Sequence, residues 1–313
     1  MRIGTVKQIW RYPVKSMAGE QIDACSVGTL GIPLDRGWAI RDETTGEITN
    51  GKHIPLLMQG YARYREPPPQ ADAGNGSVPH VVMHFPKGVE VFSDSAEVNA
   101  QLSELLGRSV SLWPLQPPSN EDFYRRKSRT ARVLGRLARQ YRPFRAALPA
   151  LTAFGRAKAD LRELFSREPG EPVPDLSTLP PEILEFTSPR GTFFDAFPIH
   201  ALTTASLEMM KRLNPQATWD VRRFRPNFLI ETDAGIKGLI ESEWPGQKLR
   251  IGAVELRCEI PTVRCGMTIQ AQKEFPKDPS ILRSIVKEAQ QNLGIYASVI
   301  EAGEVRVGDV VEI

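Results

Sequence analysis

The sequence predicts a protein of mixed helix and strand content, with two β-rich modules on either side of a helical insertion. Short apolar runs bounded by glycine, proline and asparagine fill residues 1–115 and return in residues 182–313, a pattern typical of strands joined by turns. Between them, residues 116–181 are rich in proline and in basic residues, and their apolar positions recur at helical spacing. We take these three ranges as the modules of the chain.

The composition, with 41% hydrophobic and 25% charged residues, is that of an ordinary soluble protein. No uncharged apolar run approaches the roughly 18 to 20 residues that are needed to span a bilayer. The N-terminus reads as a strand and has no signal-peptide core, so we expect a cytoplasmic protein. The sequence contains no internal repeat and no glycine-rich phosphate loop of the dinucleotide-binding or Walker A type.

The three cysteines, Cys25, Cys258 and Cys265, provide no disulfide framework and no CxxC pair. An iron–sulfur cluster of the ferredoxin kind needs four cysteine ligands, so we expect no such cluster in this chain. Any redox chemistry would therefore take its electrons from a separate protein.

The N-terminal module is predicted to be mostly β. A strand is expected over residues 3–11, with shorter extended runs at residues 23–28 and 38–41. One helix is expected over residues 95–106, where apolar residues recur at helical spacing before Gly107 ends it.

The insertion is predicted to be helical over residues 131–142 and 148–165. Its segment 123–159 holds eleven Lys or Arg and no acid, whereas the whole chain has a net charge of +3, so the remainder carries about −8. Such a local block predicts an anionic partner for this segment and argues against a general nucleic-acid-binding protein. The partner could be an acidic electron-transfer protein, an anionic membrane surface touched peripherally, or the acidic remainder of the same chain.

In the C-terminal module, Thr203 or Thr204 is expected to cap a helix over residues 205–213. A second helix is predicted over residues 280–293. Strands are predicted over residues 227–231, 248–251, 254–260 and 296–301, and a turn and strand over residues 305–313.

Cys265 lies between Arg264 and Gly266 in the otherwise apolar, strand-like stretch 259–268. Arg264 would favour the thiolate, which coordinates metals and attacks electrophiles, and Gly266 would let backbone or a cofactor come close. Most free cysteines are instead small buried hydrophobes. On this stretch alone, packing is the favoured interpretation.

Upstream, residues 221–231 place arginines and Asn227 just before an apolar run. Arginine forks hold phosphate or carboxylate oxygens bidentately. If this segment is extended, Arg223, Arg225 and Asn227 share one face, because side chains alternate along a strand. An anion-binding rim would then lie near a potential thiolate.

These two stretches resemble the MOSC domain family, which includes the C-terminal domain of molybdenum cofactor sulfurases and the mitochondrial amidoxime-reducing component. In that family the phrase Phe-Arg-Pro-Asn, here 224–227, precedes a phrase ending in Arg-Cys, here 264–265, whose cysteine binds molybdenum. Further phrases match in the same order: Tyr-Pro-Val-Lys-Ser at 12–16, Asp-Arg at 35–36, Thr-Thr-Ala-Ser-Leu at 203–207 and Val-Gly-Asp at 307–309. The resemblance covers the chain except about 118–168.

The resemblance implies an α+β fold in which a β-rich N-terminal module packs on a MOSC β-barrel, with molybdopterin in the cleft between them. By position, Lys15, Ser16 and Arg36 would bind the phosphate end of the molybdenum cofactor, and Thr203 and Thr204 would stand at a helix N-terminus that favours a phosphate. The other implied cofactor-binding residues are Arg223, Arg225, Asn227 and Arg264. Cys265 would be both the catalytic residue and the metal ligand.

The activity implied is that of a molybdenum-dependent oxidoreductase like the amidoxime-reducing component. Such an enzyme reduces N-hydroxylated or N-oxide-type compounds with electrons from a ferredoxin-like protein or a flavin reductase. Two alternatives remain: a sulfur carrier or transferase with a persulfide on Cys265, supplied by a separate pyridoxal-phosphate protein, and a non-catalytic carrier of the molybdenum cofactor. His200 and Cys258 match no functional pattern, and we predict that both residues pack in the core.

Overall fold

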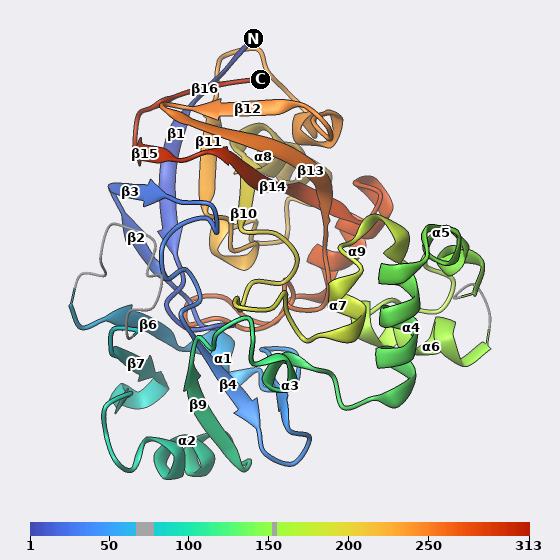
Figure 1. Cartoon of the computed structure of the whole chain (residues 1–313). Helices are drawn as coiled ribbons and strands as arrows, with labels where there is room; N and C mark the ends of the chain where they lie inside the picture. The colour runs from blue at the N-terminus through green and yellow to red at the C-terminus, as the bar shows by residue number, and fades with distance from the viewer. Residues whose placement is uncertain (67–77, 152–154) are drawn as a thin grey trace.

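A closed barrel of seven strands organises the protein, and both ends of the chain contribute to it (Figure 1). The computed structural model describes residues 1–66, 78–151 and 155–313. Around the barrel the strands follow the order β11, β10, β14, β13, β12, β16 and β1, and β1 pairs with β11 to close it. Their bounds are β1 Arg2–Arg11, β10 Ile199–Thr203, β11 Phe228–Thr232, β12 Lys248–Ile251, β13 Val254–Val263, β14 Asn292–Glu301 and β16 Val310–Glu312. The predicted α+β architecture with a β-barrel is confirmed.

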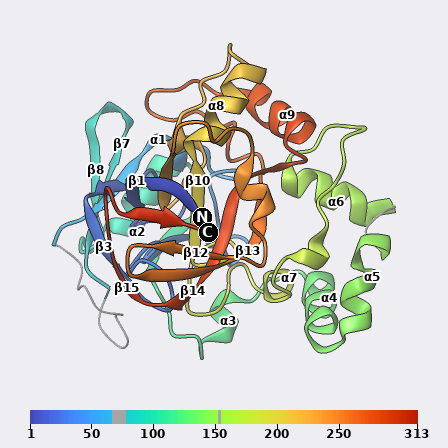
Figure 2. The ribbon, with the colours of Figure 1, turned by 90° about the horizontal axis from the view of Figure 1, so that it is seen from above.

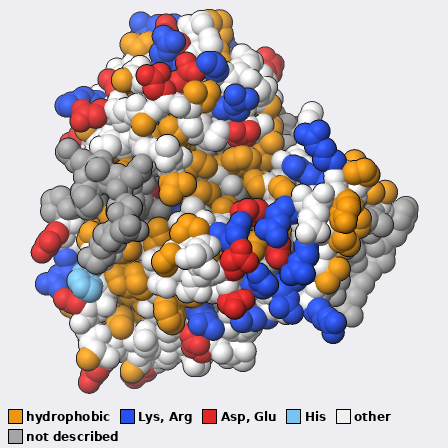
Figure 3. Space-filling model, in the orientation of Figure 1, with side chains coloured by type: hydrophobic (Ala, Val, Ile, Leu, Met, Phe, Trp, Pro, Cys, Tyr) orange, Lys and Arg blue, Asp and Glu red, His pale blue; other side chains and the backbone are white. Residues whose placement is uncertain are grey.

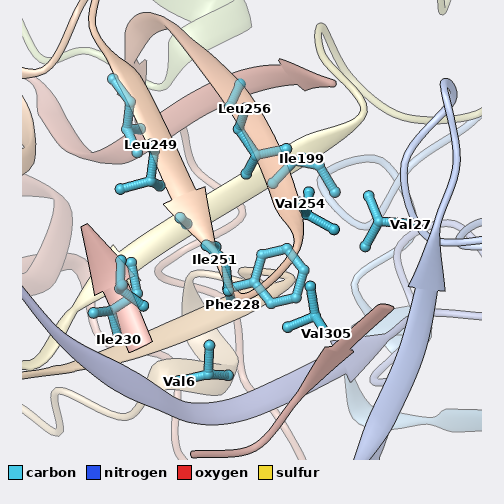
Figure 4. Close-up of a cluster of buried hydrophobic side chains, with 14 of the residues drawn as sticks. Val6, Val27, Ile199, Phe228, Ile230, Leu249, Ile251, Val254, Leu256 and Val305 are labelled. Atoms are coloured by element: carbon cyan, nitrogen blue, oxygen red, sulfur yellow. The ribbon is translucent and has the colours of Figure 1, made fainter. Parts of the chain in front are cut away.

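Side chains that alternate along the strands fill the barrel interior (Figure 4). Along β13, Val254, Leu256 and Cys258 are fully buried, whereas the intervening Glu255 and Arg257 are not. This alternation follows from the two-residue period of a strand. Cys258 therefore packs in the core, as predicted.

The strand that closes the barrel comes from the N-terminal module. Residues 4–9 of β1 pair with residues 228–232 of β11 in antiparallel register. Two short strands continue this connection: β2 (Glu20–Ile22) pairs with β1, and β3 (Ala24–Val27) pairs with β15 (Gly303–Arg306). The ranges 1–115 and 182–313 thus share one sheet.

The rest of the N-terminal module contains two small sheets with a core of their own. One sheet has the order β5, β4, β9, and the other has the order β6, β7, β8. The bounds are β4 Trp38–Asp42, β5 Glu47–Ile48, β6 Tyr61–Tyr64, β7 Val81–Phe85, β8 Val89–Phe92, β9 Val110–Pro114, α1 Leu56–Gln59, α2 Val98–Leu106 and the 3-10 turn η1 Pro86–Gly88. Gly107, with φ 63°, ends α2 as predicted.

Two helices pack against the outside of the barrel, α8 (Thr204–Leu213) and α9 (Pro279–Glu288). The cap of α8 is confirmed, since Thr203 accepts a hydrogen bond from the Ser206 amide at 3.2 Å. The prediction that the last helix reaches residue 293 is wrong. Gln290 and Gln291 have φ of 49° and 73°, and they turn the chain directly into β14.

The insertion forms a cluster of helices beside the barrel (Figures 1 and 2). Its elements are α3 Glu121–Tyr124, α4 Arg129–Gln140, α5 Arg142–Leu151, α6 Gly155–Phe165 and the 3-10 turn η2 Leu176–Thr178, and α7 Glu182–Glu185 follows directly after it. The helix predicted over 148–165 is two helices, and the residues between them, 152–154, lie outside the described part of the chain. Along the described residues, no helix is long and apolar enough to cross a membrane.

Helix α4 docks on α7 through small residues and buried charge. Ala138 is buried, and a Cβ on Gly135 would lie 2.5 Å from the Glu185 backbone nitrogen. The Glu185 carboxylate is itself buried and forms ion pairs with two arginines, with Arg139 Nη2 at 3.1 Å and Arg136 Nη2 at 3.9 Å. The chain therefore neutralises part of its own basic block.

Gly135→Ala should weaken this docking, although alanine favours a helix by about 1 kcal/mol over glycine. The added Cβ must displace α4 from the α7 backbone. We expect faster amide hydrogen exchange over residues 129–140 and unchanged exchange in the barrel strands. Gln140→Ala, at an exposed position of α4, is the matched control and should leave or raise protection. Full protection in Gly135→Ala would contradict the contact.

Candidate functional site

A cavity of about 620 Å³ lies where the N-terminal module, the insertion and the barrel meet. The N-terminal module contributes Lys15 and the segment from Asp42 to His53 to its lining, and the insertion contributes Leu164 and Phe165. The barrel side contributes Asp195, Val263, Cys265, Met267 and Tyr296. The lining therefore combines charged and polar side chains with apolar ones.

A second cavity of about 70 Å³ adjoins the first, because Asp195, Cys265 and Tyr296 line both. The additional side chains around the smaller cavity include Arg36, Arg225 and Arg264. Cys265 thus lies between a roomy cavity and a narrow cationic one.

Cys265 stands in a tight turn directly after β13. The amide and the hydroxyl of Thr268 donate to the Cys265 carbonyl at 3.2 Å and 3.0 Å, and the Gln270 side chain donates to the Gly266 carbonyl at 3.1 Å. The Arg264 amide donates to the Gln291 carbonyl at 2.9 Å. These bonds fix the backbone on both sides of a half-buried thiol.

The C-terminal end of the insertion packs against this turn. A Cβ on Gly266 would lie 2.1 Å from Ser166 Oγ. Arg167 is buried and donates from Nη2 to the Arg264 carbonyl at 2.9 Å. Burial lowers the pKa of Arg167 to about 10, and the nearby Cys265 opposes that shift. The close approach expected at Gly266 is therefore made by the side chain of Ser166.

Two arginines lie on the buried ring of Tyr12. The guanidinium carbons of Arg225 and Arg36 are 4.2 Å and 4.9 Å from the ring centroid, within the range of cation–π contacts. Burial raises the Tyr12 pKa strongly, against the effect of both arginines, and its hydroxyl donates to the Pro226 carbonyl at 2.9 Å. Burial and then Arg36 lower the pKa of Arg225 to about 10.

Several buried donors in this region make no hydrogen bond within the described residues. They are Arg225 Nη2, Arg264 Nε and Ser16 Oγ. A buried donor without an acceptor costs roughly 1 to 3 kcal/mol, and more when it is charged. These donors are therefore available to form hydrogen bonds with an anionic ligand.

Lys15 lines the large cavity and bonds to Asp195, which lines both cavities. Its Nζ donates to the Phe193 carbonyl and to Asp195 Oδ1, both at 2.7 Å. Desolvation alone would raise the pKa of Asp195, but Lys15, Arg36 and Arg225 hold it well below its usual range. Asp195 remains a carboxylate that is accessible from the cavity.

The region as a whole is cationic. Its charged groups are Lys15, Arg36, Arg225 and Arg264 against Asp35 and Asp195. The excess of positive charge and the unpaired donors fit a phosphate, and the Cys265 thiol fits a soft metal. Within the described residues, no group of three or more His, Cys, Asp or Glu could hold a metal ion.

Comparisons with known protein families identify both parts of this arrangement. The MOSC domain matches residues 188–312, and the MOSC N-terminal beta barrel domain matches residues 3–73. The chain belongs to the MOSC family. The search of curated proteins gives no match.

Solved structures show only distant likenesses. The YUAD protein APC1665 from Bacillus subtilis is 12% identical, with 98% of this chain and 93% of that chain covered and a TM-score of 0.38. YiiM from Geobacillus stearothermophilus is 15% identical, with 37% and 54% covered and a TM-score of 0.30. A hypothetical protein is 16% identical, with 37% and 50% covered and a TM-score of 0.27. Likenesses of this strength say nothing about ligand or activity.

The Phe-Arg-Pro-Asn phrase of this MOSC protein does not form the extended rim that was predicted. Residues 221–223 form the 3-10 turn η3, and Arg225 has φ 56°. The Arg223 guanidinium donates to the backbone carbonyls of Thr218, Thr268, Gln270 and Pro276 at 2.9 to 3.4 Å. These hydrogen bonds hold the loop after Cys265 in place.

Asn227 is also committed to the protein. Its side-chain oxygen accepts from the His200 amide at 3.1 Å, and its nitrogen donates to Asp35 Oδ2 at 2.9 Å. Asp35 in turn pairs with Arg36. Asn227 therefore lines the small cavity but acts through Asp35 on the arginine beside it.

The predicted phosphate position at the α8 N-terminus already holds a carboxyl group of the protein, whose pKa is raised by burial. The buried Glu241, from the 3-10 turn η4 (Ile240–Glu243), accepts from the Thr203 hydroxyl at 2.8 Å and the Ser206 hydroxyl at 2.6 Å. Thr204 bonds to Thr232. Neither threonine lines the two cavities, so Glu241 occupies this helix end and the threonines support the fold.

The remaining predictions at this site have mixed outcomes. Lys15, Arg36, Arg225, Arg264 and Cys265 converge on the cavities, and Ser16 is buried beside Lys15 with φ 70°. His200 is a core residue, as predicted, and burial holds its pKa well below the usual range. Tyr12, Asp195, Tyr296 and Arg167 also lie at the site, and no sequence pattern predicted a role for them. Tyr12 lies inside a phrase that matched the family, which was the available signal.

Gly266→Ala should destabilise the Cys265 turn, since overpacking costs about 1 to 3 kcal/mol. Ser166→Gly should restore most of the loss, because it removes the clashing atoms and relaxes a φ of 53°. Urea unfolding of both single variants and the double variant measures the coupling. Ser166→Gly alone serves as the control and should be neutral or stabilising. A double variant as unstable as Gly266→Ala would contradict the packing of the insertion on this turn.

Proposed function

We propose that this MOSC protein binds the molybdenum cofactor and reduces N-hydroxylated compounds with electrons from a separate donor protein. The observation that carries the proposal is the position of Cys265 between the large cavity and the cationic one. A thiolate ligand suits molybdenum, and the arginine side offers buried donors for a phosphate. When bound, the cofactor supplies two-electron redox chemistry at the metal.

The residues of the chain divide the remaining tasks. Lys15, Arg36, Arg225 and Arg264 hold the anionic end of the cofactor, and Ser16 Oγ is a further donor beside Lys15. Asp35 and Asn227 orient Arg36. Arg167 and Ser166 hold the Cys265 turn in place.

The larger cavity offers the substrate side. Its lining mixes apolar side chains such as Leu164, Phe165 and Ile183 with polar ones such as Lys52, His53 and Arg108. An apolar body with one polar, reducible group fits such a mixed lining. Reduction of an amidoxime takes two electrons and two protons and gives the amidine and water. Tyr296 lines both cavities, and burial raises its pKa strongly, so its hydroxyl keeps its proton.

Cys265→Ala should abolish reduction of benzamidoxime by the molybdenum-loaded protein with reduced methyl viologen as donor. Cys258→Ala should keep the activity, because Cys258 is buried in the barrel core away from both cavities. Metal analysis should find about one molybdenum per wild-type chain. Full activity of Cys265→Ala would overturn the assignment.

The same experiment separates the two other functions. Bound molybdenum without turnover would favour a cofactor carrier. An additional sulfur atom on Cys265, detected by mass spectrometry in protein without molybdenum, would favour a sulfur carrier.

Arg225→Ala should mainly reduce cofactor retention, whereas Arg223→Ala should mainly reduce stability. Arg225 has an unpaired nitrogen at the cationic cavity, so its loss should reduce cofactor retention about tenfold or more, given roughly 1.5 to 3 kcal/mol for a charge-assisted hydrogen bond. Arg223 holds four carbonyls, so its loss should mainly lower the melting temperature. Cofactor content and thermal unfolding, measured on both variants, test this contrast. Unchanged cofactor content with a lower melting temperature in Arg225→Ala would make Arg225 structural.

A further inference from the structure

Part of the basic insertion has no counter-charge in the protein. Arg126 and Arg145 donate to backbone carbonyls, and Arg136 and Arg139 face Glu185. Arg129, Arg132 and Arg142, by contrast, have no carboxylate within ion-pair distance among the described residues. Arg129 and Arg142 are exposed, and Arg132 is half-buried. The segment 123–159 contains no acid at all.

The unpaired cations share their surface with apolar side chains. Along α4 and its C-terminal cap, Arg129, Val133, Leu137 and Tyr141 recur every four residues, which places them along one side of the helix. Val133 is 52% exposed and Tyr141 is 57% exposed. The side of α4 that docks on α7 is a different one, because it carries Gly135 and Ala138.

Helix α5 extends this surface without adding an acid. Its first residue is Arg142, and Ala146, Ala147 and Ala150 are exposed. Figure 3 shows basic and hydrophobic side chains interspersed over the part of the surface that the insertion occupies. We call the exposed surface around Arg129, Arg132, Val133, Tyr141 and Arg142 the outer face.

We propose that the outer face binds an anionic lipid bilayer. Arginine forks match the geometry of phosphate oxygens, and basic residues near a membrane surface are attracted to anionic headgroups. Val133 and the Tyr141 ring can enter the boundary between headgroups and acyl chains, as the apolar side of an interfacial helix does. The outer face carries exposed apolar side chains, Val133 and Tyr141, among its cations, and this mixture favours a bilayer over an acidic protein.

The contact is peripheral and depends on both kinds of side chain. Charge brings the outer face to the headgroups and weakens as salt screens it. Apolar insertion is less sensitive to salt. The opposite side of α4 stays on α7, so the protein can bind the surface without unfolding the insertion. This inference does not depend on the proposed reaction.

Cosedimentation of the full chain with vesicles tests the proposal. We expect binding to vesicles of phosphatidylcholine with one quarter phosphatidylglycerol at low salt, and little binding to pure phosphatidylcholine. The triple variant Arg129→Gln, Arg132→Gln, Arg142→Gln should bind at least about tenfold more weakly, since each basic residue at the surface contributes a factor of about five. Val133→Ser with Tyr141→Ser should weaken the binding that persists at high salt.

The matched control is Lys211→Gln, Arg212→Gln, Lys237→Gln, which removes the same charge from exposed positions in and near α8. It should bind like the wild type, and all variants should melt like the wild type. An equal loss of vesicle binding in the control variant would show that the effect depends only on net charge, and it would overturn the proposal. The proposal would also be overturned if the wild-type protein did not bind anionic vesicles at low salt. If the triple variant then slowed reduction by an acidic donor protein, the outer face would be a protein-docking surface instead.

Discussion

The pairing of β1 with β11 is the contact on which the site depends. It closes the barrel, and the chain continues from its end into Tyr12 and Lys15 on one side, while Arg225 and Asn227 lead into it on the other. The Trp10 amide donates to the Asn227 carbonyl at 2.8 Å, and the Tyr12 hydroxyl reaches the Pro226 carbonyl. Two phrases more than 200 residues apart in the sequence therefore become neighbours because one strand completes a sheet.

Buried charge is the consequence of that closure. Guanidinium groups of Arg36, Arg225 and Arg264 are held by burial in an environment where an unpaired cation is costly. The protein compensates only in part, through Asp35, Asp195 and the Tyr12 ring. Because several buried cations are paired with few acids, a bound anion would lower the cost of burying them. This is the physical basis of the proposed cofactor site.

The sequence alone predicted most of the barrel strands, the caps of α2 and α8, and the grouping of Lys15, Arg36, Arg225 and Arg264 near Cys265, because local patterns and matched phrases record them. It could not predict the backbone at Arg225, since φ 56° there accompanies the approach of its side chain to Tyr12 and Met17. It also could not predict that Glu241 occupies the α8 N-terminus, because the two are joined only by the fold. The early end of α9 follows from the positive φ of Gln290 and Gln291. Glutamine is not a residue type that typically indicates a turn, so the sequence pattern did not predict this end.

The insertion connects the outside of the protein to the turn that holds Cys265. Neither family match includes residues 74–187, yet Leu164 and Phe165 line the cavity and Arg167 binds the peptide before Cys265. The other end of the same segment carries the outer face, which is tied to the body through Glu185. The insertion thus lines the cavity at one end and carries the outer face at the other. Because Arg167 holds the peptide before Cys265, the backbone at the site depends on contacts from a segment that lies outside both family matches.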